Sequence, residues 1–277
     1  MPKERLNDEN AGKLVTQEAQ GWNLLNHKFM RIFFQDNIEA AQLLLDIILD
    51  RKDLTVKSSK TEQYIEGIVW KSVVLDIFAV DDEGNEYDIE IQRENKGASQ
   101  RRARHNSAML DSHMLKPGQS ADELRDSYVV FITENDKFGK GQPIYVIERQ
   151  FVDNGEKFND GSHIIYVNAK NKDMATELGR LMHDMQCEDP DKMYFELLAT
   201  RTRFFKQTKE GEKQMKDLID TWMDEAREEG IEQGVIKKQT EVALSLIGLR
   251  TLSVDKIAEV TGLTVDKVNE LAATKAG

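Results

Sequence analysis

Acidic side chains interrupt a short apolar strand and its return strand, and this hairpin most constrains how the chain can fold. Residues 75–92 read "LDIFAVDDEGNEYDIEIQ". The two segments predict antiparallel strands, and "DDEGN" between them, with Gly84 and Asn85 suited to positive φ, predicts a tight turn. Asp76 lies in an otherwise apolar segment. A buried acid there is costly unless it is paired or bound to a metal ion.

The expected register of the hairpin brings two of its acids together. With residues 81–85 as the turn, Val80 pairs with Glu86, and Asp76 falls opposite Glu90. Two carboxylates held that close repel each other unless a cation lies between them. Mg²⁺ fits such a site, because it takes one or two carboxylates together with waters and phosphate oxygens.

The return strand carries further polar residues on the same face as Glu90. Alternation places Glu86, Asp88, Glu90 and Gln92 on one face. Gln92 can orient a water or a phosphate through its amide, but it cannot act as a base. The alternative is an ordinary hairpin with acids on its solvent face, and Glu86 and Asp88 fit that interpretation.

A basic helix is predicted directly after the hairpin, over residues 99–115. Its segment "QRRARHN" carries Arg101, Arg102, Arg104 and His105. Residues three and four apart share a helical face, so Arg101 or Arg102 can face the acids together with His105. Such residues would bind a phosphate at the metal. The alternative is a solvated basic face that pairs with the abundant acids.

The order of predicted elements indicates an α/β (α+β) fold with a mixed central sheet flanked by helices. Two helices are expected within residues 21–50, one or two strands between residue 53 and Val80, and then the hairpin and the basic helix. "SYVVFIT" predicts a central strand, because it is continuously apolar. Two more strands are expected in "PIYVIERQF" and "HIIYVNA", and two helices in "DMATELGRLMHDMQ" and "MYFELLATRTRFF".

The composition changes after about Thr208, which predicts three regions: a core over 1–207, a charged amphipathic helical connector over 208–240 and a small module over 241–277. The connector keeps an apolar stripe at helical spacing, which indicates a protruding helix that self-associates. In the last region, Ser253 and Thr264 are expected N-caps of two short helices of helix-turn-helix shape. The second of these helices is neutral at best, so packing or oligomerisation is favoured over reading of DNA sequence.

Bulk composition limits the partners and the compartment. The net charge is −12, so nucleic acid could be bound only through a local basic patch or through bridging metal ions. No run of residues is apolar enough for a membrane helix, and "MPKERLNDEN" lacks the apolar stretch of a signal peptide. The single cysteine, Cys187, fits a reducing compartment. A cytoplasmic protein with no membrane partner is therefore expected.

An acid in one strand, a turn, an acid-x-polar motif in the next strand and then a basic helix resemble the PD-(D/E)XK nuclease core. Much of the chain is similar to one branch, the PD-(D/E)XK nuclease family transposases or recombination-promoting nucleases. The resemblance covers roughly residues 25–170 and includes "FMRIFFQDNIEAAQLLLDIILDRKDLTV", "LDIFAVDDEGNEYDIEIQ", "RRARHNSAMLDSHMLKPGQS", "YVVFITENDKFGKGQPIY" and "FNDGSHIIYVNA". The charged "EAREEGIEQG" segment is similar as well.

The resemblance implies metal-dependent hydrolysis of DNA phosphodiester bonds. It implies that Asp76 and Glu90, with the Ile91 carbonyl, hold the metal, and that Gln92 positions the water. The metal would be Mg²⁺, with Mn²⁺ or Ca²⁺ as alternatives. Arg102, with Arg101 or Arg104, would offset negative charge in the transition state.

Three positions differ from what is common in the family or superfamily. Gln92 stands where most of the wider superfamily has Lys, although Gln is usual in this branch. His105 stands where members often have Tyr, and residues 26–28 stand where members often have an acid.

Two functions follow as hypotheses. The first is a DNA endonuclease linked to recombination, transposition or phage defence, with the C-terminal helices available for homo-oligomerisation. The second is a catalytically inactive nucleic-acid-binding or regulatory protein that retains the fold.

Overall fold

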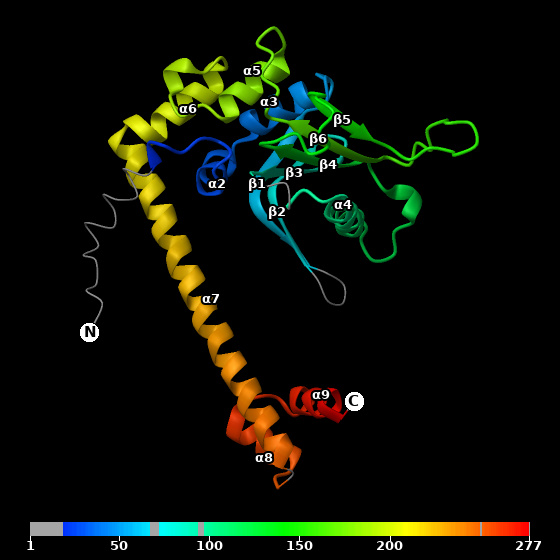
Figure 1. The fold of residues 1–277 in the computed structure, drawn as a ribbon, viewed down its shortest axis with the longest axis vertical. Coiled ribbons are helices and arrows are strands. Elements are labelled where there is room, and N and C mark those ends of the chain that lie inside the picture. Colours follow the sequence, from blue (N-terminus) through cyan, green and yellow to red (C-terminus); the bar gives the residue numbers. More distant parts are fainter. Residues whose placement is uncertain (1–18, 67–71, 94–96, 250, 277) are drawn as a thin grey trace. The chain divides into compact units, whose positions relative to one another are not determined.

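A six-stranded mixed sheet organises the first part of the chain (Figure 1). The computed structural model describes residues 19–66, 72–93, 97–249 and 251–276. The N-terminal "MPKERLNDEN" and residues 67–71, which fell in the predicted strand region, lie outside the described residues. The strand order is β1-β2-β3-β4-β6-β5. The strands are β1 Val56–Ile65, β2 Val73–Asp81, β3 Glu86–Gln92, β4 Ser127–Thr133, β5 Ile144–Ile147 and β6 Ser162–Asn168.

The predicted α/β fold with a mixed sheet is confirmed. Strands β1, β2 and β3 are antiparallel neighbours, β3, β4 and β6 run parallel, and β5 pairs antiparallel with β6. The continuously apolar β4 is buried at every residue, as a central strand covered on both faces requires. β5 is shorter than the segment expected to form it, and its last two residues are exposed.

Helices lie on both sides of the sheet (Figure 1). The described helices are α2 His27–Phe34, α3 Ile38–Ile48, α4 Gln100–Met114, α5 Glu177–Met185, α6 Glu196–Gln207, α7 Lys209–Leu249, α8 Val254–Thr261 and α9 Val265–Ala276, with short 3₁₀ helices at Ala121–Glu123 and Pro190–Lys192. α4 packs against β3, β4 and β6, and α2 and α3 pack against β1. Ser99 caps α4 by accepting a hydrogen bond from the Arg102 N–H, which fixes where the basic helix begins.

The turn of the β2–β3 hairpin is organised by Asp81. Its carboxylate accepts hydrogen bonds from the N–H groups of Glu83 and Asn85, from the Asn85 side chain and from the Tyr87 hydroxyl. Gly84 has a φ of +84°, as expected for this turn, but Asn85 does not adopt a positive φ and instead donates a hydrogen bond from its side chain to Asp81. A side chain that satisfies four donors holds the two strands at one register.

The chain divides into two compact units, Met1–Lys216 and Asp217–Gly277, and the boundary falls inside α7. In the second unit Ala243 of α7 packs with Ile257 and Ala258 of α8 and with Val268 of α9. Ser253 and Thr264 accept hydrogen bonds from the N–H groups of Lys256 and Lys267, so both expected N-caps are confirmed. Within the described residues, no helix has the length and apolar character needed to cross a bilayer.

Candidate active site

Asp76 lies at the open end of the hairpin, next to the last paired residue of β2. The pairs run from Val80 with Glu86 to Ile77 with Ile89, so the expected register is confirmed up to the residue next to Asp76. Asp76 is 8% exposed, and its Oδ2 accepts a hydrogen bond of 2.9 Å from the Ile91 N–H. The carboxylate of β2 therefore reaches the β3 backbone one residue beyond Glu90.

Glu90 and Asp88 are completely buried under α4. Asn106 of α4 lies between them, and its side-chain amide donates to Asp88 Oδ2 at 2.8 Å and to Glu90 Oε1 at 3.2 Å. Asp88 Oδ1 is buried and has no hydrogen-bond partner among the residues that the structure describes. Glu86 is 6% exposed, and its carboxyl group is hydrogen-bonded to His113 of α4. The alternative of a solvent-facing strand is therefore wrong for both Asp88 and Glu86.

Arg102 supplies the positive charge at the centre of the acids. One of its Nη atoms donates to Glu90 Oε2, and the other donates to the Gly97 carbonyl at 3.2 Å. The Gln92 amide donates to the same Glu90 oxygen at 3.2 Å. A Cβ atom at Gly97 would overlap the Gln92 Oε1, so glycine is required for Gln92 to lie where it does.

Burial and mutual repulsion make the acids difficult to ionise. Burial raises the pKa of Glu90 to about 9, with repulsion from Asp88 and Asp76 adding to the effect and Arg102 and Gln92 opposing it. Burial raises the pKa of Asp88 to about 7, against the hydrogen bond from Asn106. Burial also raises the pKa of Asp76, although the Ile91 N–H and His27 favour its charged form. Perturbed acids that share a small volume are typical of functional sites.

The N-terminal end of α2 completes this region, and the sequence patterns did not identify it. His27 has its Nε2 at 3.7 Å from Asp76 Oδ1 and at 3.7 Å from Glu62 Oε1. Glu62 of β1 is also paired with Arg31 at 2.7 Å, and its φ of +52° is unusual for a residue other than glycine. Among the positions noted as departing from the family, His27 therefore lies beside Asp76 in space.

The remaining basic residues of α4 lie away from the acids. Arg101 and Arg104 are exposed, and no hydrogen bond or ion pair among the described residues joins either to the acids. His105 is half-buried, and its Nε2 has no partner. Of the four basic residues in this segment, the structure thus brings Arg102 to the acids and leaves Arg101 and Arg104 available to solvent.

Two residues of the cluster, Asp88 and Asn106, were not among the expected site residues. Asp88 shares the strand face of Glu90, and Asn106 follows Arg102 by four residues on α4. The i, i+4 spacing from Arg102 is the one signal that could have indicated Asn106. Within the described residues, no group of three or more His, Cys, Asp or Glu side chains is arranged to hold a metal ion.

Comparison with known proteins agrees with this architecture. The family model for PD-(D/E)XK nuclease family transposases matches residues 25–239, and the chain belongs to this family. No curated protein and no solved structure matches the chain. Membership supports a nuclease- or transposase-related function with DNA as the substrate, in a class whose members typically use divalent metals and include inactive proteins.

Proposed function

We propose that the chain is a divalent-metal-dependent DNA endonuclease that hydrolyses phosphodiester bonds at the β2–β3 hairpin. The observation that best supports this proposal is that Asp76, Asp88 and Glu90 lie together beside Arg102. All three acids are buried and have a raised pKa. A chain retains such a costly cluster where a cation or a reacting group uses it.

The donor set is suited to a hard divalent cation such as Mg²⁺, Mn²⁺ or Ca²⁺. Asp76 and Glu90 offer carboxylate oxygens, and Mg²⁺ needs only one or two of these. The lack of a three-residue cluster among the described residues therefore does not conflict with Mg²⁺ binding. Asp76, Glu90 and the Ile91 carbonyl would hold the cation. When bound, it would supply Lewis-acid chemistry, which polarises a phosphate and lowers the pKa of water.

The other residues of the hairpin and α4 have roles that follow from their positions. Gln92, fixed over Gly97, would orient the attacking water through its amide. Arg102 would leave one Glu90 oxygen and donate to the phosphate, where charge builds up in the transition state. Arg101, Arg104 and His105, on the outer part of α4, would contact phosphates of the DNA backbone.

The test is cleavage of supercoiled plasmid by the purified protein with Mg²⁺, Mn²⁺ or Ca²⁺. Asp76→Asn and Glu90→Gln keep the shape of each acid and remove its ability to ionise and bind a cation, so both should abolish nicking. Glu83→Gln is the matched control, because Glu83 is an exposed acid in the turn of the same hairpin. Cleavage that survives in both site variants would disprove the assignment.

A second candidate is a nucleic-acid-binding or regulatory protein without activity. The observation that favours it is the ion pair of Glu90 with Arg102, which gives Glu90 an internal cation in place of a metal. Binding of DNA with no cleavage by any metal would establish this candidate. Both candidate functions are compatible with a cytoplasmic role in recombination, transposition or phage defence.

Self-association belongs to the same proposal. The α7 residues of the second unit expose large apolar side chains, among them Met223, Ile231, Val235 and Ile236. Exposed apolar residues on one long helix are typical of helices that pair with a second copy. Light scattering coupled to size exclusion, repeated with Ile231→Glu, tests whether this helix forms a homo-oligomer.

A further inference from the structure

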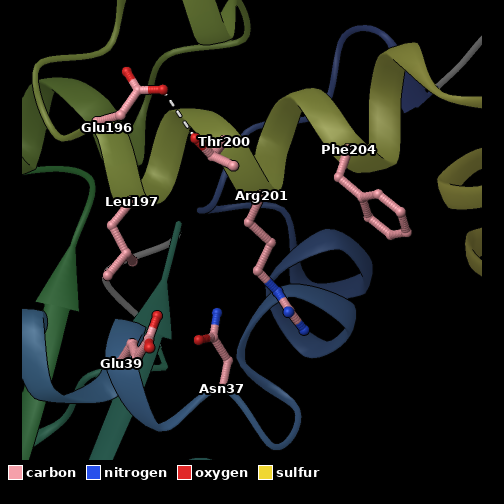
Figure 2. A pocket seen from close by; sticks show the side chains of 7 residues that line it. All are labelled: Asn37, Glu39, Glu196, Leu197, Thr200, Arg201 and Phe204. Atoms are coloured by element: carbon pink, nitrogen blue, oxygen red, sulfur yellow. Dashed lines mark hydrogen bonds between the residues drawn. The ribbon is translucent and has the colours of Figure 1, made fainter.

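A pocket remote from the hairpin acids lies between α6 and the beginning of α3. Its volume is about 520 Å³, and Figure 2 shows Leu197 and Arg201 extending from α6 toward Asn37 and Glu39. It is lined by Asn37, Glu39, Glu196, Leu197, Thr200, Arg201 and Phe204. All of these residues belong to the first unit.

Arg201 is a half-buried cation with no carboxylate partner among the described residues. Its Nη2 donates to the Gln35 carbonyl at 3.4 Å, and its Nε is buried without a hydrogen-bond partner in the described part of the chain. The guanidinium lies 5.7 Å from the Phe33 ring and 5.3 Å from the Phe205 ring. Burial lowers the pKa of Arg201, and no neighbouring acid counteracts this. Buried charges in folded proteins are normally paired, so this guanidinium lacks an anion.

The two acids that line the pocket do not fill this role. The Glu196 carboxylate is held by the Thr200 hydroxyl at 2.9 Å and by Arg203 at 3.4 Å. Glu39 is exposed and lies in the first turn of α3, where a carboxylate is favoured by the helix dipole. Neither acid is therefore paired with Arg201, and the pocket beside the guanidinium has room for a ligand.

We propose that this pocket binds a phosphate group through Arg201. The planar guanidinium presents several donors in a fixed fork that matches phosphate oxygens, and Arg201 lines the pocket. The phosphate could be carried by a nucleic-acid strand or by a small phosphorylated compound. In both cases the chemistry recognised is the same.

The position of the pocket favours the nucleic-acid source, and this step rests on the proposed function. α2 connects the two places, since its first residue, His27, faces Asp76, and its C-cap residue, Gln35, accepts the hydrogen bond from Arg201. Eight helical residues span about 12 Å, which corresponds to roughly three to four base pairs along a duplex. One nucleic acid could therefore contact both places. A chain of net charge −12 needs such local cations.

The first experiment measures binding of inorganic phosphate by ³¹P NMR at constant ionic strength, without metal or DNA. Arg201→Gln should weaken binding about tenfold or more, because a charge-assisted contact is removed. Glu39→Gln should strengthen binding several-fold, because it removes a negative charge at the pocket. Lys192→Gln, an exposed lysine away from the pocket, is the control and should change nothing. Phosphate binding that is equal in wild type and Arg201→Gln overturns the proposal.

Glu39→Gln distinguishes phosphate binding from a purely structural role of Arg201 as a clamp between α6 and α2. If Arg201→Gln does not fold, as judged by circular dichroism, Glu39→Gln carries the test, since Glu39 is exposed. A phosphate affinity that Glu39→Gln leaves unchanged then overturns the proposal.

The second experiment identifies the source of the phosphate. Duplex DNA binding is followed by fluorescence anisotropy against salt concentration in the presence of a chelator, so that cleavage plays no part. If the phosphate belongs to DNA, Arg201→Gln should reduce the magnitude of the salt slope by about 0.9. An unchanged slope together with lost binding of inorganic phosphate assigns the pocket to a small phosphorylated compound. Neither result depends on whether the hairpin site is an active nuclease.

Discussion

The Arg102 guanidinium donates to the Glu90 carboxyl group, so a residue at the start of α4 gives a fully buried acid of the hairpin a cationic partner. Glu90 has no exposed surface, whereas about a third of the Arg102 side chain is exposed. The pair therefore joins the buried acids to the surface at which a substrate would arrive.

Replacement of Arg102 should make the fold depend on a divalent cation. Arg102→Gln should lower the free energy of unfolding by about 1–3 kcal/mol, because Glu90 loses a charged hydrogen bond. Millimolar Mg²⁺ should recover part of that loss and should stabilise this variant more than the wild type, since it takes the place of the missing cation. Urea unfolding with and without Mg²⁺ measures both effects.

The control for this prediction is Arg101→Gln, because Arg101 is exposed on the same helix turn. It should leave the stability and its response to Mg²⁺ unchanged. Equal unfolding of wild type and Arg102→Gln would show that the ion pair contributes nothing.

Asp88 should reduce the stability of the fold. Its carboxylate is fully buried, has one partnerless oxygen and is repelled by Asp76. Asp88→Asn keeps an oxygen for the Asn106 amide and removes the charge, so it should stabilise the protein by about 1 kcal/mol at pH 8. Thermal unfolding beside the exposed control Asp122→Asn measures this, and a lower melting temperature for Asp88→Asn would refute it.

Gly97 should control activity through Gln92. An alanine Cβ would overlap Gln92 Oε1 and turn that side chain away, so Gly97→Ala should reduce cleavage by about tenfold or more with little loss of stability. The test is a double-mutant cycle of plasmid cleavage rates. Combined with Gln92→Ala, the glycine replacement should have no further effect. Additive losses would mean that Gly97 acts by another route.

Asp81 should stabilise the hairpin in a pH-dependent manner. Burial alone would raise its pKa, but hydrogen bonds from Tyr87, Asn85 and two backbone N–H groups outweigh this and place the pKa below its usual value. The stabilisation is therefore complete above the unfolded-state pKa of about 4 and is lost as pH falls through the lower folded-state value.

Asp81→Asn should accordingly lower the free energy of unfolding by about 1.5–3 kcal/mol at pH 7 and by less near pH 3. Urea unfolding across this pH range checks the sign. Asp82→Asn, an exposed neighbour in the same turn, is the control. A loss that is the same at both pH values would show that the charge of Asp81 is not involved.

The local part of this protein could be predicted from its sequence. Alternation, the turn residues and Gly84 predicted the hairpin and its register, and Ser253 and Thr264 predicted two helix starts. These features depend on neighbours within a few residues, so the pattern contains the needed information. The prediction that Asp76 lies close to Glu90 followed from the same register.

Tertiary structure decided which residues surround those acids and how they are charged. The packing of α4 on the sheet buried Asp88 and brought Asn106 and Arg102 to it and to Glu90, whereas Arg101 and Arg104 stayed exposed. The packing of α2 on β1 brought His27 close to both Asp76 and Glu62. The physical reason is that a helix has a direction and a rotation on a sheet that only the whole core determines, and burial sets the pKa values once that choice is made.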